Sequence, residues 1–164
     1  MSAHAADPAA FKAVMRRHPT GVTVVTSVRE DEPRGITLNA FASVSAAPPM
    51  LLICVNRQAR SYLYISTSRV FCVNLLSVEQ ADLAARFSGG IKERQFEDIA
   101  YGSDATGAPV LDGTVGYFDC AVESEHHVGS HSIFIGRVLA CASRPGRPLG
   151  YYEGTFQDFS AEDA

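Results

Sequence analysis

The most distinctive stretch of this sequence covers residues 35–45, where apolar and polar side chains alternate. At the strand period of two, one face carries Ile36, Leu38, Ala40, Ala42 and Val44. The opposite face carries Thr37, Asn39, Phe41, Ser43 and Ser45, which are short uncharged hydrogen-bonding groups and one aromatic ring. Such a face would suit a flat polar ligand laid along the strand. The alternation alone fits equally an ordinary buried or edge strand.

A second candidate site lies where an apolar strand should give way to a helix. Residues 51–55 are all apolar and predict a central strand, and residues 56–61, Asn-Arg-Gln-Ala-Arg-Ser, follow it directly. With Ser61 as N-cap, the first N–H groups of a helical stretch over 62–67 would point at an anion, and Arg57 and Arg60 would add cationic donors. The pattern predicts a phosphate site, although a solvated turn with an ordinary serine cap fits it as well.

Two further groups of residues could take part in chemistry. Arg86, beside Phe87 at the end of a helical pattern over 78–87, offers another cation, although cations are common near helix C-termini. His126, His127 and His131 cluster, but no carboxylate or cysteine completes a metal-ligand spacing, so we predict no metal site. His131 opens an apolar strand, where its imidazole could be packed, bind a ligand or handle a proton.

Several common enzyme frameworks are missing from the sequence. No Gly-x-Ser-x-Gly turn precedes a helix, so a Ser–His–Asp hydrolase is not indicated. Neither the Rossmann fingerprint Gly-x-Gly-x-x-Gly nor a P-loop occurs, so any nucleotide would be held in another frame. The four cysteines, Cys54, Cys72, Cys120 and Cys141, lie far apart among apolar neighbours, which predicts small buried side chains in a reducing compartment.

Length and composition limit the possible classes of protein. The chain has 164 residues, which predicts a single domain over residues 1–164. Lys plus Arg is 14 and Asp plus Glu is 18, so the net charge of −4 disfavours nucleic-acid binding. Because no apolar run could span a membrane and the N-terminus lacks the features of a secretion signal, we expect a cytoplasmic protein.

The elements that must position these residues are mostly strands. Helical patterns occur at residues 8–17, 61–67 and 78–87, the last with a capping box between Ser77 and Gln80. Besides 35–45, the sequence predicts strands at 20–28, 50–56, 70–75, 114–123, 131–142 and 148–152, a charged turn over 30–35, and a long surface loop and possible lid over 91–112. Seven strands with few helices predict a mostly-β fold, an antiparallel barrel or sandwich.

Five segments of the chain match one known family in order and spacing. They are residues 17–26 (RHPTGVTVVT), 35–45 (GITLNAFASVS), 48–56 (PPMLLICVN), 71–76 (FCVNLL) and 129–131 (GSH). These segments resemble the short-chain NAD(P)H:flavin reductases, the reductase components of two-component flavin-dependent monooxygenases. The resemblance covers a core of about residues 10–155 and leaves short flexible termini. It favours the ligand-binding interpretation of both candidate sites.

The resemblance implies a split β-barrel of Greek-key antiparallel strands that forms a homodimer, with flavin in a groove near the dimer interface. On the matching positions, Thr37, Leu38, Asn39 and Ala40 would edge the flavin ring and ribityl chain, with Ser43 and Ser45 nearby. Asn56, Arg60 and Ser61 would hold the flavin phosphate region, helped by Arg86 and Phe87. His131 matches the histidine of the family's Gly-Asp-His motif, close to the nicotinamide, and Tyr151 or Tyr152 would approach the dinucleotide. Ser130 replaces the usual aspartate, which removes a carboxylate that could orient His131, although a serine can still accept a hydrogen bond.

The activity implied by the resemblance is hydride transfer from NADH or NADPH to FAD or FMN, which supplies diffusible reduced flavin to a partner monooxygenase. NADH is slightly favoured, because no cluster of arginines awaits a 2′-phosphate. No strong acid or base is needed, since the two cofactors carry the chemistry. Two alternatives stay open: a flavin-binding or carrier barrel without activity, and a flavin oxidase of the pyridoxamine-phosphate-oxidase-like barrels.

Overall fold

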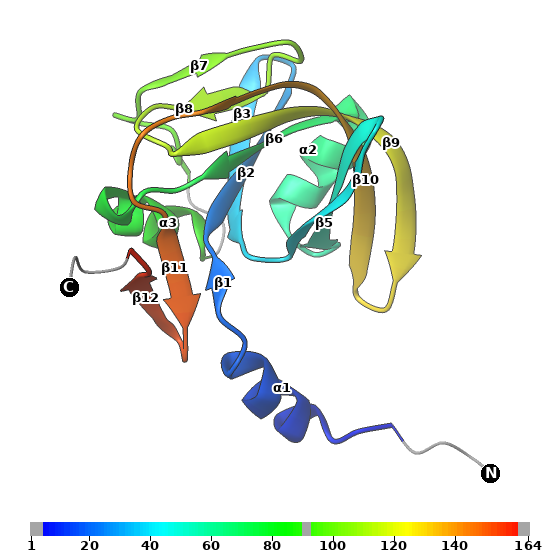
Figure 1. The fold of residues 1–164 in the computed structure, drawn as a ribbon. Helices are drawn as coiled ribbons and strands as arrows, with labels where there is room; N and C mark the ends of the chain where they lie inside the picture. The colour runs from blue at the N-terminus through cyan, green and yellow to red at the C-terminus, as the bar shows by residue number, and fades with distance from the viewer. Residues whose placement is uncertain (1–4, 90–92, 161–164) are drawn as a thin grey trace.

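The computed structural model describes residues 5–89 and 93–160, and its largest element is a seven-stranded antiparallel sheet (Figure 1). Across this sheet the strands follow the order β3-β2-β6-β9-β10-β5-β4. Their bounds are β2 (Thr23–Arg29), β3 (Glu32–Leu38), β4 (Phe41–Ala46), β5 (Pro49–Asn56), β6 (Val70–Leu75), β9 (Gly116–Val128) and β10 (His131–Ser143). Strands β3 and β4 form the two opposite edges of the sheet, yet only residues 39 and 40 separate them in the chain. The sheet must therefore curl so that its two edges come close together. The predicted mostly-β, barrel-like fold is confirmed.

Smaller elements pack around this sheet. Strand β11 (Leu149–Tyr152) pairs with β1 (Thr20–Gly21) and β12 (Thr155–Asp158), while β7 (Tyr101–Ser103) pairs with β8 (Pro109–Leu111). The helices are α1 (Pro8–Arg16), α2 (Arg60–Ser68), the short 3-10 turn η1 (Val78–Gln80) and α3 (Ala81–Phe87). Helix α2 packs against β2 and α3 packs against β3. The predicted capping box is present, since Gln80 Oε1 accepts from the N–H of Ser77 at 3.1 Å.

Three apolar clusters are buried in the described part of the chain, and two of them hold the strands that carry the candidate sites. The larger lies between the sheet and α2, and it includes the fully buried Ile53, Ile65, Phe71 and Phe134. The smaller includes Val24, Leu76, Phe87, Leu111 and Leu149. Burial of each such side chain stabilises the fold by about 1.5–3 kcal/mol. Strand β3 and the start of α2 are therefore fixed by the cores beneath them.

The structure interrupts two predicted strands. The strand predicted over 20–28 breaks at Val22, where the chain passes from β1 in the small sheet to β2 in the large one. The strand predicted over 35–45 ends at Leu38 and resumes at Phe41, and its register shifts again between Ser43 and Ser45. The single alternating face over 35–45 is therefore wrong, because the chain changes from one sheet edge to the other in its middle. Phe41 packs against the larger core instead.

Two loops and two cysteines also differ from the predictions. The charged turn predicted over 30–35 shrinks to Glu30 and Asp31, both with positive φ, and residues 32–35 belong to β3. The loop predicted over 91–112 contains β7 and β8, while its residues 91 and 92 lie outside the described residues. The termini predicted to be flexible, on either side of the core 10–155, are described only over residues 5–9 and 156–160, where they include the start of α1 and most of β12, while residues 1–4 and 161–164 lie outside the described residues. Cys72 and Cys120 are buried as predicted, whereas Cys54 is half-buried and Cys141 is exposed.

Helix α1 stands away from the sheet (Figure 1). None of its residues is buried, and Phe11 and Val14 are 61% and 70% exposed. Its C-terminal end is tied to the turn between β11 and β12, where Glu153 forms an ion pair with Arg17 and donates its N–H to the carbonyl of Arg16 at 3.2 Å. Among the residues that the structure describes, no helix has both the length and the hydropathy that crossing a bilayer requires.

Candidate functional site

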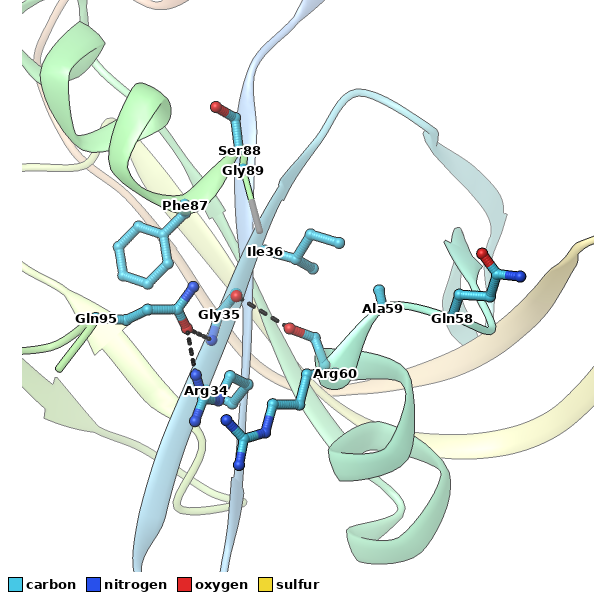
Figure 2. Close-up of a pocket in the computed structure, with 11 residues that line it drawn as sticks. Arg34, Gly35, Ile36, Gln58, Ala59, Arg60, Phe87, Ser88, Gly89 and Gln95 are labelled. Carbon is cyan, nitrogen blue, oxygen red and sulfur yellow. Dashed lines mark hydrogen bonds between the residues drawn. The ribbon is translucent and has the colours of Figure 1, made fainter. Parts of the chain in front are cut away.

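Two neighbouring hollows follow strand β3, and we call them together the β3 groove. The larger encloses about 370 Å³, and its lining includes Thr37, Leu38, Asn39, Ser88, Tyr151 and Phe156. The smaller encloses about 150 Å³, and its lining includes Arg34, Gly35, Arg60, Ser61, Phe87 and Gln95 (Figure 2). Ser88 lines both hollows. A ligand laid along β3 would therefore contact both.

The groove opens at the free edge of β3, which is the outermost strand of the sheet beside β2. Both peptide groups of Gly35 point to this edge, since its N–H donates to Gln95 Oε1 at 3.4 Å and its carbonyl accepts from Ser61 Oγ at 3.0 Å (Figure 2). Peptide groups alternate sides along a strand, so the N–H and carbonyl of Thr37 point the same way. The edge thus offers a ligand a donor and an acceptor held rigidly by the sheet.

The larger hollow has an uncharged lining. The hydroxyl of Thr37 donates to the carbonyl of Ala84 at 2.7 Å and so joins β3 to α3, while Asn39 Nδ2 donates to Thr20 Oγ1 at 3.1 Å. Tyr151 and Phe156 pack together with ring centroids 5.9 Å apart. Aromatic rings beside amide and backbone groups form a surface that suits a flat heteroaromatic ligand.

The smaller hollow is suited to an anion. Helix α2 begins at Arg60, and its N-cap Ala59 has no side-chain hydrogen bond. The N–H of Tyr62 donates to the carbonyl of Ala59 at 3.0 Å, so the helix N-terminus presents Arg60 and Ser61 to this hollow. The guanidinium groups of Arg60 and the buried Arg34 lie on the same side of the pocket (Figure 2). The predicted N-cap at Ser61 is wrong, because the N-cap lies two residues earlier, at Ala59, and the Ser61 hydroxyl donates to the carbonyl of Gly35.

Close contact between α3 and β3 closes one side of the smaller hollow. A Cβ atom at Gly35 would lie 2.6 Å from the ring of Phe87, so the absence of a side chain lets the two elements approach. Phe87 is 2% exposed and stacks edge-on against Phe96, with ring centroids 5.2 Å apart. Phe87 therefore forms a rigid wall of the hollow.

Arg86 does not line the β3 groove, although its positive charge had suggested a role at the phosphate site. Its Nη2 donates to the carbonyl of Arg94 at 3.1 Å and to that of Glu97 at 2.6 Å, so the side chain is directed at the segment 94–97. From this segment the buried Gln95 reaches Gly35 and Arg34, with its Oε1 3.3 Å from Arg34 Nη1. Arg86 thus holds the segment that supplies Gln95 to the smaller hollow.

The predicted histidine lies outside the β3 groove, at the turn between β9 and β10. His131 is exposed and lies directly opposite Asn56 in the β5–β10 ladder. Its Nδ1 is 2.9 Å from Ser130 Oγ, so a serine hydroxyl contacts the ring where the resemblance leads one to expect a carboxylate. Within residues 5–89 and 93–160, no three His, Cys, Asp or Glu side chains are grouped so as to hold a metal ion.

The structure brings together about half of the predicted site residues. Those that line the groove are Thr37, Leu38, Asn39, Arg60, Ser61, Phe87 and Tyr151. Those that do not are Ala40, Ser43, Ser45, Asn56, Arg86, Ser130, His131 and Tyr152. Asn56 instead shapes the turn into α2, since its Oδ1 accepts from the N–H of Gln58 at 2.9 Å.

Sequence reasoning missed four polar residues of the smaller hollow, Arg34, Gln58, Ser88 and Gln95. Arg34 precedes Ile36 by two positions, the spacing of side chains on one face of a strand, and this would have placed it on β3 had the turn been limited to Glu30 and Asp31. Gln95 lies in a segment without periodicity, so nothing in the sequence indicated that it returns to β3.

The domain model described as "Flavin reductase like domain" matches residues 15–160. The chain therefore belongs to the flavin reductase-like family, and the resemblance and fold inferred from the sequence are confirmed. One curated relative is the reductase subunit HsaB of a flavin-dependent monooxygenase from Mycobacterium tuberculosis. It is 36% identical over 159 residues, which cover 95% of this chain and 84% of HsaB.

Two further comparisons agree with this assignment. The FMN reductase (NADH) SmoA from Agrobacterium fabrum is 36% identical over 152 residues, which cover 93% of this chain and 86% of SmoA. Among solved structures, the NADH:FAD oxidoreductase SgcE6 from Streptomyces globisporus C-1027 superposes with a TM-score of 0.88 at 32% identity. That superposition covers 98% of this chain and 99% of SgcE6.

Proposed function

We propose that this chain is an NADH-dependent flavin reductase that supplies reduced flavin to a separate monooxygenase. The β3 groove carries the proposal, because an uncharged hollow for a flat ring adjoins an anion-attracting hollow on one strand. A ring followed by a phosphate is the order of parts in a flavin nucleotide. The names of the relatives support it: HsaB is a reductase subunit of a flavin-dependent monooxygenase, SmoA an FMN reductase using NADH, and SgcE6 an NADH:FAD oxidoreductase.

The smaller hollow would bind the flavin phosphate. The first N–H groups of α2 would donate to phosphate oxygens, favoured by the positive end of the helix dipole. The guanidinium of Arg60 would add charge-assisted hydrogen bonds. Ser61 uses its hydroxyl on the carbonyl of Gly35, so it holds the start of α2 against β3. The phosphate site is thus assembled by fixing a helix N-terminus at a sheet edge.

The larger hollow would bind the flavin ring. The N–H and carbonyl of Thr37 would pair with the polar edge of the ring, and Asn39 would contact it beyond the end of β3. The bound flavin supplies the chemistry, which is acceptance of a hydride from the nicotinamide. Backbone N–H groups fixed at the strand edge stabilise negative charge on a neighbouring ring without an acid or base side chain. The uncharged lining is consistent with that role.

His131 would contact the nicotinamide dinucleotide. Its exposed imidazole is bonded to Ser130 and lies opposite Asn56, the last residue of the strand that leads into α2. Tyr151, which lines the larger hollow, would approach the same ligand. Contacts of the dinucleotide with Tyr152 stay predictions, as do contacts of flavin with Ala40, Ser43, Ser45, Asn56 and Arg86, since these residues do not line the groove.

The chain would act as a homodimer through the outer face of β4, β5 and β10. On this face Leu52 lies opposite Ile135, and Cys54 lies opposite Ile133. These half-exposed apolar side chains alternate with buried ones, and Val44 of β4 is 49% exposed beside them. A contiguous apolar sheet face of this kind favours association with a second copy. A cytoplasmic location would suit the free cysteines and the supply of NADH.

Steady-state kinetics tests the proposed function. The purified chain, mixed with NADH and either FAD or FMN, should oxidise NADH faster than the flavin alone, and the rate should saturate with flavin concentration. A carrier barrel would bind flavin and leave NADH untouched. An oxidase with a resident flavin would show no dependence on added flavin. Either of these results would contradict the proposal.

A further inference from the structure

A third hollow adjoins the phosphate end of the β3 groove, and we call it the outer hollow. It encloses about 310 Å³ and is lined by Glu32, Pro33 and Arg34 of β3 and by residues 94–97. Arg34 and Gln95 also line the smaller hollow, so these two side chains stand between them. Three hollows therefore follow β3 in sequence, at residues 37–39, 34–36 and 32–34.

The charges of the outer hollow differ from those of the phosphate end. The carboxylates of Glu32 and Glu97 border it, with side chains 56% and 51% exposed. A hydrogen bond from Tyr64, assisted by the charge of Arg34, lowers the pKa of Glu32 and keeps it ionised at neutral pH. Two carboxylates would repel a terminal phosphate but would accept hydrogen bonds from hydroxyl and amino groups. The outer hollow therefore suits a ribose and a base.

Arg94 supplies a flat surface in the same hollow. Its guanidinium is oriented by Glu97, with Nη1 3.2 Å from Glu97 Oε1, and its side chain is 77% exposed. The backbone carbonyl of Arg94 accepts a hydrogen bond from Arg86, so the segment that carries Arg94 is anchored to α3. A planar guanidinium stacks well on an aromatic base. An adenine could thus lie on Arg94 with its amino group directed at a carboxylate.

We propose that this reductase takes FAD in preference to FMN, with the adenosine monophosphate half of FAD in the outer hollow. FMN ends at its phosphate, whereas FAD continues beyond it with a second phosphate, a ribose and adenine. Ring, phosphate and adenosine then match the larger, smaller and outer hollows in order along β3. Arg34, which lines both of the last two, would lie beside the pyrophosphate. This inference rests on the proposed function, because it assigns the flavin that the same groove binds.

Flavin binding in the absence of NADH tests the inference. Affinities for FAD, FMN and riboflavin would be measured by calorimetry on the native chain and on Arg94→Asn. Asparagine is chosen because the backbone of residue 94 has a φ of 63°, which it tolerates. We expect FAD to bind the native chain at least tenfold more tightly than FMN. Arg94→Asn should lower the affinity for FAD about fivefold and change the affinity for FMN less than twofold.

Controls and contrary results separate this inference from the proposed function. Lys12→Ala, a change at an exposed residue of α1, should alter the affinity for neither flavin. If Arg94→Asn fails to fold, Glu97→Gln should lower the affinity for FAD selectively. Equal affinities for FAD and FMN in the native chain would overturn the inference but not the reductase. If Arg94→Asn raises the KM for NADH and leaves the affinity for FAD unchanged, the adenosine in the outer hollow belongs to NADH. That result would also overturn the inference. Failure to bind any flavin would overturn the proposed function itself.

Discussion

Asn56 and His131 lie directly opposite each other on β5 and β10. The contact continues beyond the ladder, because the N–H of Arg57 donates to the carbonyl of Ser130 at 3.1 Å and Arg57 Nη2 donates to that of Gly129 at 2.6 Å. The turn that carries His131 is thus bonded to the segment that leads into α2. The proposed nicotinamide contact and the proposed phosphate site are linked through a few residues of rigid backbone.

Replacement of His131 should affect NADH more than flavin. We expect His131→Ala to raise the KM for NADH about tenfold, as the loss of one hydrogen-bonding group in a site allows, and the KM for flavin less than twofold. Steady-state kinetics with each substrate varied in turn measures both. His126→Ala, which removes another exposed histidine of the same hairpin, is the matched control. Equal changes in the two KM values would assign His131 a structural role.

Removal of the Arg60 guanidinium should weaken the binding of flavins that carry a phosphate. A charge-assisted hydrogen bond contributes about 1.5–3 kcal/mol, so Arg60→Gln should raise the Kd of FMN at least tenfold. Riboflavin, which has no phosphate, should bind the variant and the native chain alike. Arg69→Gln at the other end of α2 serves as the control. Equal weakening of riboflavin and FMN would argue against a phosphate at this hollow.

A methyl group at Gly35 should disturb the wall of the groove. Alanine would place a Cβ atom 2.6 Å from the buried ring of Phe87, and overpacking of this kind costs about 1–3 kcal/mol. Gly35→Ala should therefore lower the free energy of unfolding measured in urea and weaken flavin binding. Gly102→Ala, where a Cβ would meet nothing within 4 Å, should do neither. An unchanged unfolding midpoint for Gly35→Ala would contradict the close contact of α3 with β3.

A charge on the outer face of the sheet should separate the dimer. Leu52→Glu places a carboxylate among Ile133, Cys54 and Ile135, where a second copy would bury it unpaired. We expect this variant to run as a monomer in sedimentation at a concentration where the native chain is dimeric. Leu63→Glu, at an exposed leucine of α2, should leave the dimer intact. A native chain that is monomeric at high concentration would contradict this interface.

Acid should destabilise the native chain in part through Glu125. Burial raises the pKa of this carboxyl, but hydrogen bonds from Ser66, Ser132, Tyr62 and His127 outweigh it, so the net pKa lies below its ordinary value of 4.5. A lowered folded-state pKa means that this contribution is complete above pH 4.5 and disappears as the pH falls through the folded-state value. Glu125→Gln should lower the free energy of unfolding, measured in urea, by about 1 kcal/mol at pH 7 and by much less in strong acid. Glu123→Gln, at an exposed neighbouring position on β9, should show no such pH-dependent difference.

Most of the fold follows from local patterns in the sequence. The periodic helix over 8–17, the apolar strands near 50–56 and 70–75, and the capping box at Ser77 all appear where the pattern placed them. These elements depend on side-chain periodicity and on turns within a few residues, which are properties of neighbouring positions in the chain. The family could be identified for the same reason, since its motifs are short and contiguous.

The composition of the groove required the tertiary structure. The alternation over 35–45 put Thr37, Asn39, Ser43 and Ser45 on one face, but only Thr37 and Asn39 line the larger hollow, because the chain crosses between sheet edges after Leu38. Gln95 and Tyr151 reach β3 from distant parts of the chain, and Arg86 is turned away from the groove by carbonyl groups of residues 94 and 97.

The sequence by itself determined most of the local elements and the family to which the chain belongs. Only the tertiary structure decided which side chains meet at the free edge of β3. The physical reason is that periodicity and capping act over a few neighbouring residues, whereas the groove is formed by packing between segments that are up to 134 positions apart, such as Val22 and Phe156.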